Sequence, residues 1–420
     1  MKILVVGSGA REDAICQSLQ KSDRYNDVYC APGNAGMKLS GIQTVGINEM
    51  EFTKLADFAI ENDVNYTVVG PEQPLVEGIV DYFHERGLRI FGPDKKAAQI
   101  EGSKTFTKNL MKNANVPTAF FQEFTDFGLA IEYVEKTDKF PIVIKANGLA
   151  SGKGVFIVES LDAAIDVLHD LLKDHQFGTE KVVIEEYLQG EEFSLMAFVN
   201  GSNFYPMPIA QDYKRALDGD QGLNTGGMGA VCPVENISSD VVYSAYKHVL
   251  KPFVRQMEAE EVSYTGVLYA GLIMTANGLR VIEFNVRFGD PETEVVLPRL
   301  KSDLSKVIDN LLLNEDVDDI TWRDHGLDLG VFVASNGYPT NPEMGKSIGT
   351  KEQFTDTQLE INFAGVNEND GELITDGGRL YLVHTHAHTL LNAQDKVYSY
   401  LENVDTTNVF YRKDIGHNSN

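Results

Sequence analysis

The sequence predicts a multidomain protein of the α/β and α+β classes, built in three parts. Its 420 residues are nearly three times the ~150 residues of a typical domain. The first hundred residues alternate strand and helix patterns, which is typical of a parallel, Rossmann-like sheet. The middle carries β runs joined by glycine-rich segments, and the last hundred residues consist of short strand patterns and turns. We therefore expect an α/β domain, a mixed central region with a small subdomain, and a mostly β C-terminal domain.

The N-terminal part contains the clearest alternation. Residues 3–6 form an apolar run closed by Gly7, as in a strand buried on both faces. Apolar residues between 52 and 60 recur at helical spacing and mark one face of a helix. A strand at 68–70, a helix at 75–83 and a strand at 90–92 follow. Strands separated by single helices predict right-handed crossovers and a parallel sheet, whose ligands bind at the carboxyl ends of the strands.

Three turns are expected at that edge of the sheet, at residues 7–9, 32–34 and 70–72. The first turn does not complete a dinucleotide-binding fingerprint, because Glu12 stands where the third glycine is needed. Residues 28–31 also lack the acidic residue that would hold a ribose. A nicotinamide-dinucleotide site is therefore disfavoured, although the helix N-terminus after the first turn can still bind a monophosphate.

The middle region begins with a small α+β module around a glycine-rich loop. Two β runs, 142–145 and 155–158, are joined by residues 146–154, and a helical stripe at 161–172 and a strand at 182–184 follow. The loop holds three glycines and Lys153, and Lys145 precedes it, but its spacing is not that of a P-loop. Backbone N–H groups and ammonium groups together suit a phosphate. The sequence therefore predicts a phosphate-binding loop, with a solvated hairpin tip as the alternative.

A second group of candidate site residues lies on the predicted strand at 281–288. Strand alternation places Glu283, Asn285 and Arg287 on one face, with Ile282, Phe284, Val286 and Phe288 facing a core. A carboxylate and an amide oxygen are suitable Mg²⁺ ligands, and an arginine can bind a carboxylate or phosphate with two hydrogen bonds. The sequence predicts a metal and phosphate site here rather than an ordinary amphipathic strand.

The composition excludes several classes of partner. Thirty-six Lys and Arg against 62 Asp and Glu give a net charge of −26, which disfavours nucleic acid and anionic membranes as partners. The three cysteines form no CxxC motif, so neither a disulfide framework nor a zinc knuckle is expected. No apolar stretch approaches 18 residues. These features predict a cytoplasmic protein.

The sequence shows no candidate nucleophile for covalent catalysis and only a weak candidate for a zinc-binding site. No Gly-x-Ser-x-Gly motif occurs, and no motif surrounds any cysteine. His384, His386 and His388 would share one strand face, but no cysteine or acidic cluster lies beside them. We expect these histidines to be structural or exposed.

Short motifs along the chain occur in a specific order, and the most specific are Asn-Thr-Gly-Gly-Met-Gly at 224–229 and Arg-Phe-Gly-Asp-Pro-Glu at 287–292. Taken in order, these motifs resemble the glycinamide ribonucleotide synthetase (phosphoribosylamine–glycine ligase) family of the ATP-grasp superfamily. The resemblance spans almost the whole chain, through residues 9–12, 31–36, 70–76, 91–93, 101–104, 148–155, 190–192, 224–229, 282–292 and 412–416.

The resemblance implies an N-terminal domain at 1–102, an ATP-grasp domain at 103–322 with a lid subdomain at about 118–190, and a C-terminal domain at 323–420. It implies that ATP, glycine and 5-phosphoribosylamine give glycinamide ribonucleotide, ADP and phosphate through glycyl phosphate, the second step of de novo purine synthesis. The implied metal is Mg²⁺, with Mn²⁺ as an alternative, and the implied form is a monomer. Another ATP-grasp carboxylate–amine ligase, a nicotinamide-dependent oxidoreductase and a catalytically silent ATP-binding homologue are the competing hypotheses.

The resemblance also assigns roles to residues. The metal ligands would be Glu283 and Asn285, and the catalytic residues Arg287, Asp212 and Asp290. The ATP-binding residues would be Lys104, Lys145, Ser151, Gly152, Lys153, Gly154, Glu185, Glu186, Leu188 and Glu192. The substrate-binding residues would be Gly9, Arg11, Glu12, Gly33, Asn34, Gly70, Pro71, Glu72, Lys214, Asn224, Thr225, Gly226, Gly227 and Arg287.

Three positions depart from the family pattern, and one loop is expected to move. Asp13 and Tyr213 stand where histidine is usual, and Asn147 where aspartate is usual. The loop at 146–154 is expected to be mobile alone and to become ordered with Mg-ATP, as a lid over the acyl phosphate. Trypsin cleavage at Lys153 that Mg-ATP suppresses is the expected signature.

Overall fold

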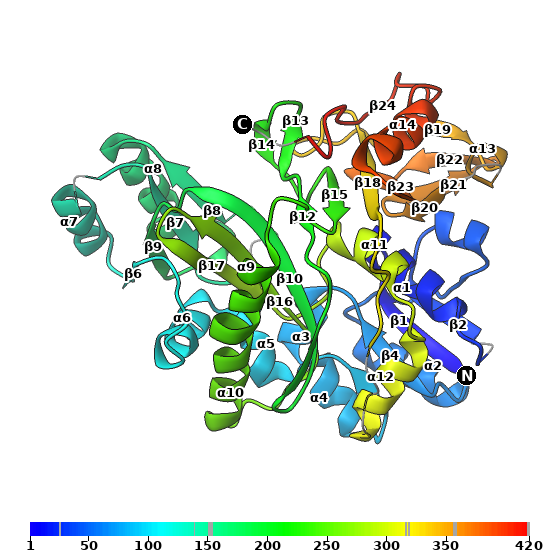
Figure 1. Ribbon diagram of the computed structural model, residues 1–420, viewed down its shortest axis with the longest axis horizontal. Helices are drawn as coiled ribbons and strands as arrows, with labels where there is room; N and C mark the ends of the chain where they lie inside the picture. The colour runs from blue at the N-terminus through cyan, green and yellow to red at the C-terminus, as the bar shows by residue number, and fades with distance from the viewer. Residues whose placement is uncertain are drawn as a thin grey trace.

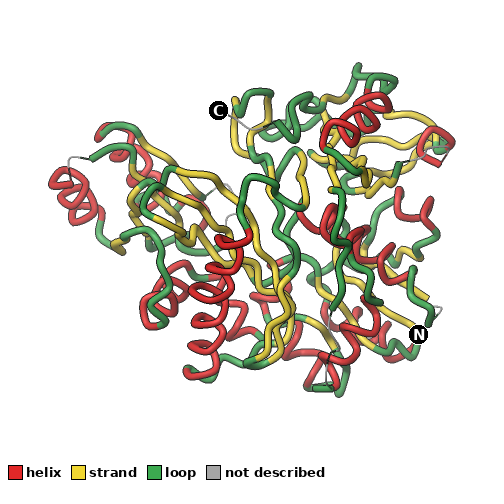
Figure 2. The backbone as a smooth tube through the Cα atoms, in the orientation of Figure 1, coloured by secondary structure: helices red, strands yellow, loops and turns green. Residues whose placement is uncertain are grey.

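The computed structural model describes residues 1–24, 27–137, 139–149, 154–315, 317, 320–355 and 359–417. Figure 1 shows a small lid module at one end of the molecule, with the N-terminal and C-terminal parts together at the other end. A central set of long strands lies between them. In Figure 2, helices gather around the N-terminal and central strands, whereas strands dominate the C-terminal part. The predicted multidomain α/β and α+β architecture is confirmed.

The N-terminal part is a five-stranded sheet of order β3-β2-β1-β4-β5. Every neighbouring pair is parallel, as the strand–helix alternation predicts. Residues Leu4 and Val6 enter one apolar core and Ile3 and Val5 another, because successive side chains point to opposite faces. The strands are β1 (Lys2–Gly7), β2 (Asp27–Pro32), β3 (Gln43–Thr44), β4 (Tyr66–Val69) and β5 (Ile90–Phe91).

The helices of this part are α1 (Ala10–Gln20), the 3₁₀ helix η1 (Gly36–Ser40), α2 (Phe52–Glu61), α3 (Glu72–Glu77) and α4 (Ile79–His84). The prediction of a single helix at 75–83 is wrong, because the chain forms two helices, α3 and α4, that are separated at Gly78. That glycine has a φ of +94°, and its N–H closes α3 on the carbonyls of Pro74 and Leu75. A left-handed residue at the end of a helix costs least when it is glycine.

Two helices lead into the lid module: α5 (Lys95–Gly102), capped by Asp94, and α6 (Lys104–Asn113), capped by Ser103. The lid is an antiparallel sheet of order β6-β9-β7-β8 with its own apolar core. The predicted strands and helix of this module are present. Its elements are β6 (Phe121–Phe124), α7 (Phe127–Thr137), β7 (Ile142–Ala146), β8 (Val155–Val158), α8 (Leu161–Leu172), η2 (Gln176–Gly178) and β9 (Val182–Glu186).

The central sheet has the order β11-β10-β16-β17 and is antiparallel. Phe253 of a covering helix stacks on Phe284 of β17, with ring centroids 3.8 Å apart. The strands are β10 (Gly190–Asn200), β11 (Asn203–Pro206), β16 (Thr265–Thr275) and β17 (Gly278–Asn285). The helices are α9 (Ser239–Ala245), the π-helical η3 (Tyr246–Leu250), α10 (Lys251–Ala259), α11 (Glu292–Val296), η4 (Leu297–Arg299) and α12 (Leu304–Leu313).

The strand expected at 281–288 is shorter than its pattern indicates. It ends at Asn285, and the register shifts where Gly271 and Leu272 face Glu283 and Val281. Ile282 is the unpaired residue of this bulge; it is half-buried and lines the cleft described below, so its expected place in the core is wrong. Arg287 lies beyond the strand yet still reaches that cleft.

The C-terminal part is a six-stranded sheet that contains the path β12-β15-β18-β23-β20, with β24 paired to β18. The expectation of little helix is wrong for α14 (Leu390–Leu401), which buries Ala393, Val397 and Leu401. The strands of this sheet are β12 (Gln211–Asp212), β15 (Gly229–Cys232), β18 (Leu327–Ser335), β20 (Glu360–Phe363), β23 (Arg379–Ala387) and β24 (Val409–Phe410). Smaller elements are the hairpin β13 (Arg215–Leu217) and β14 (Gln221–Asn224), the sheet β19 (Ser347–Thr350), β21 (Val366–Asn369) and β22 (Glu372–Thr375), and α13 (Glu352–Thr355).

A search of the described helices finds none that is long and apolar enough to cross a membrane.

Helix α1 joins the N-terminal part to the C-terminal sheet through Asp13. The Asp13 carboxylate is fully buried and accepts hydrogen bonds from the Phe363 N–H at 2.6 Å and from Gln17 at 3.1 Å. Burial raises the pKa of Asp13 from 3.8 to about 7, although these two hydrogen bonds oppose the shift. The carboxylate that replaces the family's histidine is therefore a contact between two domains.

This contact predicts a pH-dependent loss of stability. Between pH 4 and 7 Asp13 ionises in the unfolded chain before it ionises in the folded protein, so its contribution to stability falls as the pH rises through this window. The thermal midpoint of the wild type, minus that of Asp13→Asn, should decrease from pH 4.5 to pH 7.5. A difference that stays constant over this range would contradict the expectation.

Candidate active site

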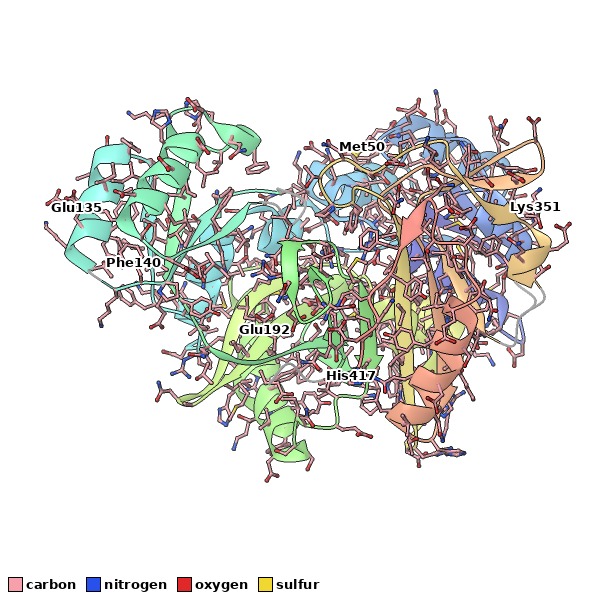
Figure 3. All side chains as sticks on the ribbon, turned by 90° about the horizontal axis from the view of Figure 1, so that it is seen from above. Met50, Glu135, Phe140, Glu192, Lys351 and His417 are labelled. Carbon is pink, nitrogen blue, oxygen red and sulfur yellow. The ribbon has the colours of Figure 1, made fainter. Side chains whose placement is uncertain are left out.

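A cavity of about 450 Å³ lies where the N-terminal part, the lid, the central strands and the C-terminal sheet meet. In the view of Figure 3, Glu192 lies near the middle of the molecule, between the lid that carries Glu135 and Phe140 and the C-terminal part that carries Lys351. The cavity is lined by Ser8, Gly9, Arg11, Glu12, Glu49, Pro71, Glu72, Ile100, Glu101, Lys104, Thr107, Lys108, Met111, Lys145, Gly148, Leu149, Gly154, Val155, Glu185, Gly226, Ile282, Glu283, Phe284, Asn285, Arg287, Asp290 and Arg379.

The lid side of the cleft carries a cluster of buried cations. Glu185 of β9 joins two lysines, with its carboxylate oxygens 3.0 Å from the ammonium groups of Lys108 and Lys145. Burial raises the pKa of Glu185, but the two lysines outweigh it and hold the pKa below its usual value. Burial lowers the pKa of Lys108 to about 8 despite Glu185. Lys104, at the first turn of α6, reaches the Gly148 carbonyl of the glycine-rich loop at 3.4 Å. Such a cluster suits a polyphosphate.

Glu283 and Asn285 of β17 face these lysines across the cleft. Within the described residues, neither the Glu283 carboxylate nor the Asn285 side-chain amide makes a hydrogen bond or an ion pair. Burial would raise the pKa of Glu283, but Lys145, Lys214 and Lys104 together hold it below the usual value, so the carboxylate is charged. Gly271 of the neighbouring strand lies opposite Glu283. An anionic oxygen and an amide oxygen with no protein partner fit a Mg²⁺ ion that also takes phosphate oxygens as ligands.

Arg287 lies between two carboxylates from the N-terminal side of the cleft. Its guanidinium is 3.0 Å from Glu101 and 3.5 Å from Glu72. Burial lowers the pKa of Arg287, and Glu101 and Glu72 more than compensate, so the arginine stays charged. Burial raises the pKa of Glu101 to about 7 even with Arg287 beside it. Arg287 is thus a fixed cation in the middle of the cleft.

Glu12 organises the N-terminal turns, because its carboxylate occupies the space that side chains at two glycines would need. A Cβ at Gly70 would lie 1.9 Å from the Glu12 carboxylate, and one at Gly7, where φ is +133°, would lie 2.5 Å from its Cγ. The carboxylate accepts the Gly9 N–H at 2.7 Å and pairs with Arg11 at 2.5 Å. The Arg11 guanidinium also donates to the Phe288 carbonyl at 3.2 Å. These contacts fix the start of α1 at the cleft.

The C-terminal part supplies Arg379, the first residue of β23. Its guanidinium pairs with Asp290 at 2.8 Å and donates to the carbonyls of Gly226 at 2.6 Å and Gly227 at 3.3 Å. A Cβ at Gly9 would lie 3.6 Å from the other oxygen of Asp290, so this pair adjoins the N-terminus of α1. Residues from three distant parts of the chain therefore meet at one end of the cleft.

Glu192, Asp212 and Lys214 lie around a small adjoining cavity that shares Ile282 and Glu283 with the main cleft. The Lys214 ammonium donates to the Glu192 carboxylate at 2.8 Å. Burial raises the pKa of Asp212 to about 7, and Lys214 opposes the shift. These three residues form the polar wall beside Glu283.

The structure brings most of the expected site residues together. Those that line the main cleft are Gly9, Arg11, Glu12, Pro71, Glu72, Lys104, Lys145, Gly154, Glu185, Gly226, Glu283, Asn285, Arg287 and Asp290. The expected residues Ser151, Gly152 and Lys153 lie outside the described residues. The expected residues Glu192, Asp212 and Lys214 line the small adjoining cavity instead. The expected residues that line neither cavity are Gly33, Asn34, Gly70, Glu186, Leu188, Asn224, Thr225 and Gly227.

Two of these have other contacts that explain their place. The Asn34 amide donates to the carbonyls of Ser8 and Phe363, each at 2.9 Å, and so joins the first turn to the C-terminal sheet. The Glu186 carboxylate accepts the Phe120 N–H at 2.8 Å and closes the edge of the lid sheet. Both side chains thus hold backbone segments in place and do not line the cleft.

Sequence reasoning missed four charged residues of the cleft: Glu49, Glu101, Lys108 and Arg379. Glu101 lies in the segment singled out for Lys104, so its carboxylate could have been considered. Arg379 follows two glycines and directly precedes the apolar run 380–383, which is a detectable signal. Lys108 and Glu49 carry no local signal, because only the packing of α6 and of the loop before α2 brings them to the cleft.

The three departures have structural roles. The Asn147 amide oxygen accepts the Thr105 N–H at 3.1 Å and so supports the start of α6. The Tyr213 ring lies 5.4 Å from the Arg412 guanidinium. Asp13 is the domain contact described above.

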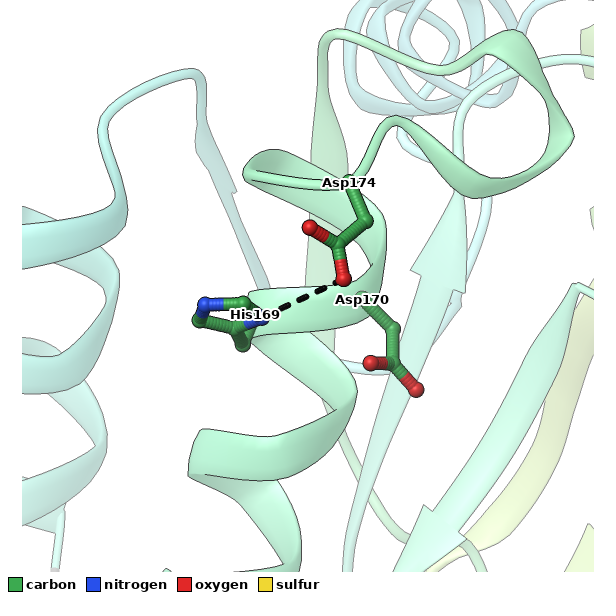
Figure 4. Close-up of side chains that lie close together, drawn as sticks. All are labelled: His169, Asp170 and Asp174. Carbon is green, nitrogen blue, oxygen red and sulfur yellow. Dashed lines mark ion pairs between the residues drawn. The ribbon is translucent and has the colours of Figure 1, made fainter.

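The histidines and one surface cluster do not join the cleft. His384 is buried, His386 pairs with Asp328 at 3.0 Å, and His388 is exposed just beyond β23. Within the part of the chain that the structure describes, one group of three possible metal-ligating side chains occurs, His169, Asp170 and Asp174 on the lid (Figure 4). All three are exposed, and Asp174 already approaches His169 at 3.5 Å. We interpret this group as a solvated surface.

Comparison with known protein families identifies three consecutive models. The N domain of phosphoribosylglycinamide synthetase matches residues 1–101, its ATP-grasp (A) domain matches residues 102–293, and its C domain matches residues 328–418.

Individual proteins give the same result. The chain is 49% identical over 420 residues to a phosphoribosylamine–glycine ligase of Streptococcus suis, covering 99% of both chains. It is 51% identical over 419 residues to the ligase of Halalkalibacterium halodurans, covering 99% of this chain and 96% of the relative. A crystal structure of phosphoribosylamine–glycine ligase from Thermotoga maritima superposes with a TM-score of 0.86 at 34% identity, over 99% of this chain and all of that one. The biotin carboxylase domain of a Hydrogenobacter thermophilus 2-oxoglutarate carboxylase shares the fold, with a TM-score of 0.74 at 17% identity over 98% of this chain and 91% of that one.

Proposed function

This chain belongs to the phosphoribosylglycinamide synthetase family and catalyses the ATP-dependent joining of glycine to phosphoribosylamine, the second step of purine biosynthesis, and on this premise we propose how its cleft performs the reaction. The observation that carries the proposal is the pair of unpartnered ligands, Glu283 and Asn285, facing three lysines across one cavity. That arrangement suits a metal–triphosphate complex.

The nucleotide lies on the lid side of the cleft in this proposal. Lys104 and Lys145 neutralise its phosphates, and Glu185 holds Lys145 in place through the 3.0 Å ion pair. Glu283 and Asn285 hold the metal, Mg²⁺ or Mn²⁺, which supplies Lewis-acid neutralisation of the phosphate charge. Glu192 binds the ribose hydroxyls beside Lys214. In this proposal Lys104 and Lys145 bind the phosphate end of ATP, and the Glu192 carboxylate binds its ribose.

The acceptor lies at the opposite end, where Arg11, Arg379 and the N-terminus of α1 meet. The first N–H groups of a helix have no intrahelical acceptor and favour an anion, so the 5-phosphate of phosphoribosylamine fits there. Glu72 reaches the ribose, and the Asp290 carboxylate, next to Arg379, accepts a hydrogen bond from the amine. The phosphate end and the amine end of one substrate are then held by residues of three domains.

The chemistry proceeds without a covalent enzyme intermediate. A carboxylate oxygen of glycine attacks the γ-phosphorus, the bond to ADP breaks, and glycyl phosphate forms. The amine nitrogen of phosphoribosylamine then attacks the glycyl carbonyl carbon, phosphate leaves, and the amine gives up a proton. Arg287, fixed by Glu72 and Glu101, stabilises the negative charge that develops on the transferring groups. The protein acts by positioning and charge neutralisation.

A coupled assay of ADP release tests this scheme. Turnover should need both glycine and freshly made phosphoribosylamine, and mass spectrometry should find glycinamide ribonucleotide with one oxygen of [¹⁸O]carboxyl-labelled glycine transferred to phosphate. Product without transfer of label would rule out glycyl phosphate. Ligation of another carboxylic acid in preference to glycine would overturn the assigned substrate.

We further propose a cytoplasmic monomer. One chain supplies every wall of the described cleft, and its three cysteines are buried free thiols, as in a reducing compartment. A light-scattering mass near 46.5 kDa is expected, and a stable dimer would contradict the monomer.

The assignment of Glu192 gives a prediction for nucleotide selectivity. Glu192→Ala should weaken ATP binding by about 1.5–3 kcal/mol, the scale of hydrogen bonds to a charged group, and should barely affect 2′,3′-dideoxy-ATP. Titration with each nucleotide measures the difference. The neighbouring Glu191→Ala is the control and should leave both affinities unchanged. Equal losses for the two nucleotides would remove Glu192 from the ribose site.

A further inference from the structure

The segment Arg412–Gly416, which the sequence singled out, contacts a hairpin on the edge of the active site. Arg412 is only 1% exposed, and its guanidinium holds Asp414 through two hydrogen bonds of 2.8 Å. A buried arginine with this bidentate geometry marks a fixed point in the structure. The other hydrogen bonds of Arg412 within the described residues run to the β13–β14 hairpin, and its guanidinium also lies 5.4 Å from the Tyr213 ring.

Four hydrogen bonds fasten that hairpin to the C-terminal segment. The Arg412 guanidinium donates to the Arg215 carbonyl at 3.1 Å and to the Asp220 carboxylate at 2.9 Å. The Asp414 carboxylate accepts the Gly219 N–H at 2.7 Å, and the Asp218 carboxylate accepts the Lys413 N–H at 2.7 Å. We call this set of contacts the C-terminal clasp.

The hairpin has little else to hold it. β13 and β14 form a separate two-stranded sheet with an irregular register, and residues 217–224 are exposed. An isolated two-stranded hairpin is marginally stable in water. The clasp therefore supplies the tertiary contacts that fix its position.

Both ends of the hairpin lead into the active site. Lys214, directly before β13, pairs with Glu192 at 2.8 Å, and its carbonyl accepts the Thr225 N–H at 2.8 Å and the Thr225 hydroxyl at 2.7 Å. The Thr225 hydroxyl in turn accepts the Gly227 N–H at 2.9 Å, in the glycine turn that Arg379 contacts. A shift of the hairpin would displace the wall of the acceptor site.

From these contacts we infer that Arg412 is a positioning residue for the ligase reaction: through the C-terminal clasp it holds Lys214 and the Thr225–Gly227 turn where the acceptor binds. The inference rests on the proposed function of the cleft. Lys104 and Lys145 belong to other elements, and the clasp reaches the ATP side through the Lys214–Glu192 ion pair. The clasp therefore acts more on the acceptor than on ATP. Arg412 itself touches no substrate.

Arg412→Lys tests this inference, since it keeps the positive charge but loses the bidentate geometry. We expect kcat/KM for phosphoribosylamine to fall about 10- to 10²-fold, the scale of a displacement of about 1 Å at a reacting group, and Mg-ATP affinity without acceptor to change less than about threefold. Amide hydrogen exchange should increase at residues 213–227. Leu223→Gln, on the exposed face of the same hairpin, is the control and should behave as the wild type.

The outcomes separate this inference from the proposed function. If the wild type fails to make glycinamide ribonucleotide, the proposed function fails, and the exchange experiment still reports whether the clasp holds the hairpin. If the wild type is active and Arg412→Lys keeps its kcat/KM for the acceptor, the positioning role is wrong. A parallel loss of ATP and acceptor binding with a lowered thermal midpoint would show a merely structural role and overturn the inference as well.

Discussion

Glu283→Gln should lower turnover by about 10²-fold or more while the fold stays intact. The substitution keeps the shape of the side chain and removes the charge that holds the metal against the triphosphate. The Glu283 carboxylate faces Lys104, Lys145 and Lys214, so its neutralisation also makes the net charge of this part of the cleft more positive. Steady-state turnover as a function of Mg²⁺ concentration, with circular dichroism to check the fold, measures the effect.

The control for this variant is Glu123→Gln on β6 of the lid. The Glu123 carboxylate is half-buried and pairs with Lys181 at 3.7 Å, outside the residues that line the cleft. Its removal should leave turnover within about twofold of the wild type, the scale of a surface ion pair. Near-normal activity of Glu283→Gln at limiting Mg²⁺ would remove Glu283 from the metal site.

Arg379→Met should lower kcat/KM for phosphoribosylamine by about 10- to 10²-fold, which corresponds to about 1.5–3 kcal/mol for hydrogen bonds to a charged group. The methionine retains much of the length of the arginine side chain but cannot bind the 5-phosphate. With ribosylamine, which lacks that phosphate, the variant and the wild type should show similar, low activity. The same two substrates and the coupled ADP assay give both comparisons.

Tyr338→Phe is the matched control, because it removes a different contact to the same glycine turn. The Tyr338 hydroxyl accepts the Gly226 N–H at 2.9 Å, so the variant loosens the turn without removing a positive charge. Its effect should be the same with and without the phosphate on the acceptor. If Arg379→Met behaves in this way too, Arg379 supports the turn and does not bind the phosphate.

Local sequence patterns were sufficient to predict much of the fold and several residues on the lid side of the cleft. The alternation of apolar runs predicts the parallel sheet, and the period-two spacing of Glu283 and Asn285 places both on one strand, as β17 confirms. Lys145 and Gly154 lie at the two ends of the loop in a predicted hairpin, and the two strands of that hairpin, β7 and β8, pair in the structure. These features depend on residues a few positions apart, where backbone geometry alone sets the arrangement.

The same local reasoning was wrong where a single residue or a distant partner decides. The left-handed Gly78 divides the helix expected at 75–83. The bulge at Ile282 directs the side chain of this residue, which was expected in the core, toward the cleft. The first feature comes from the backbone conformation of one glycine and the second from the pairing of β17 with β16. The spacing of the apolar residues indicates neither.

By itself, then, the sequence determined the class of the protein, the strand that carries Glu283 and Asn285 and, through its resemblance to a family, the reaction. Only the tertiary structure brought Arg379 from β23 to the N-terminus of α1 and joined Lys108 to Lys145 through Glu185. The structure also connected Arg412 to a hairpin some two hundred residues earlier. The reason is physical: charged groups meet across domains only after the apolar cores fix their elements, and no local periodicity encodes which distant charge will lie opposite.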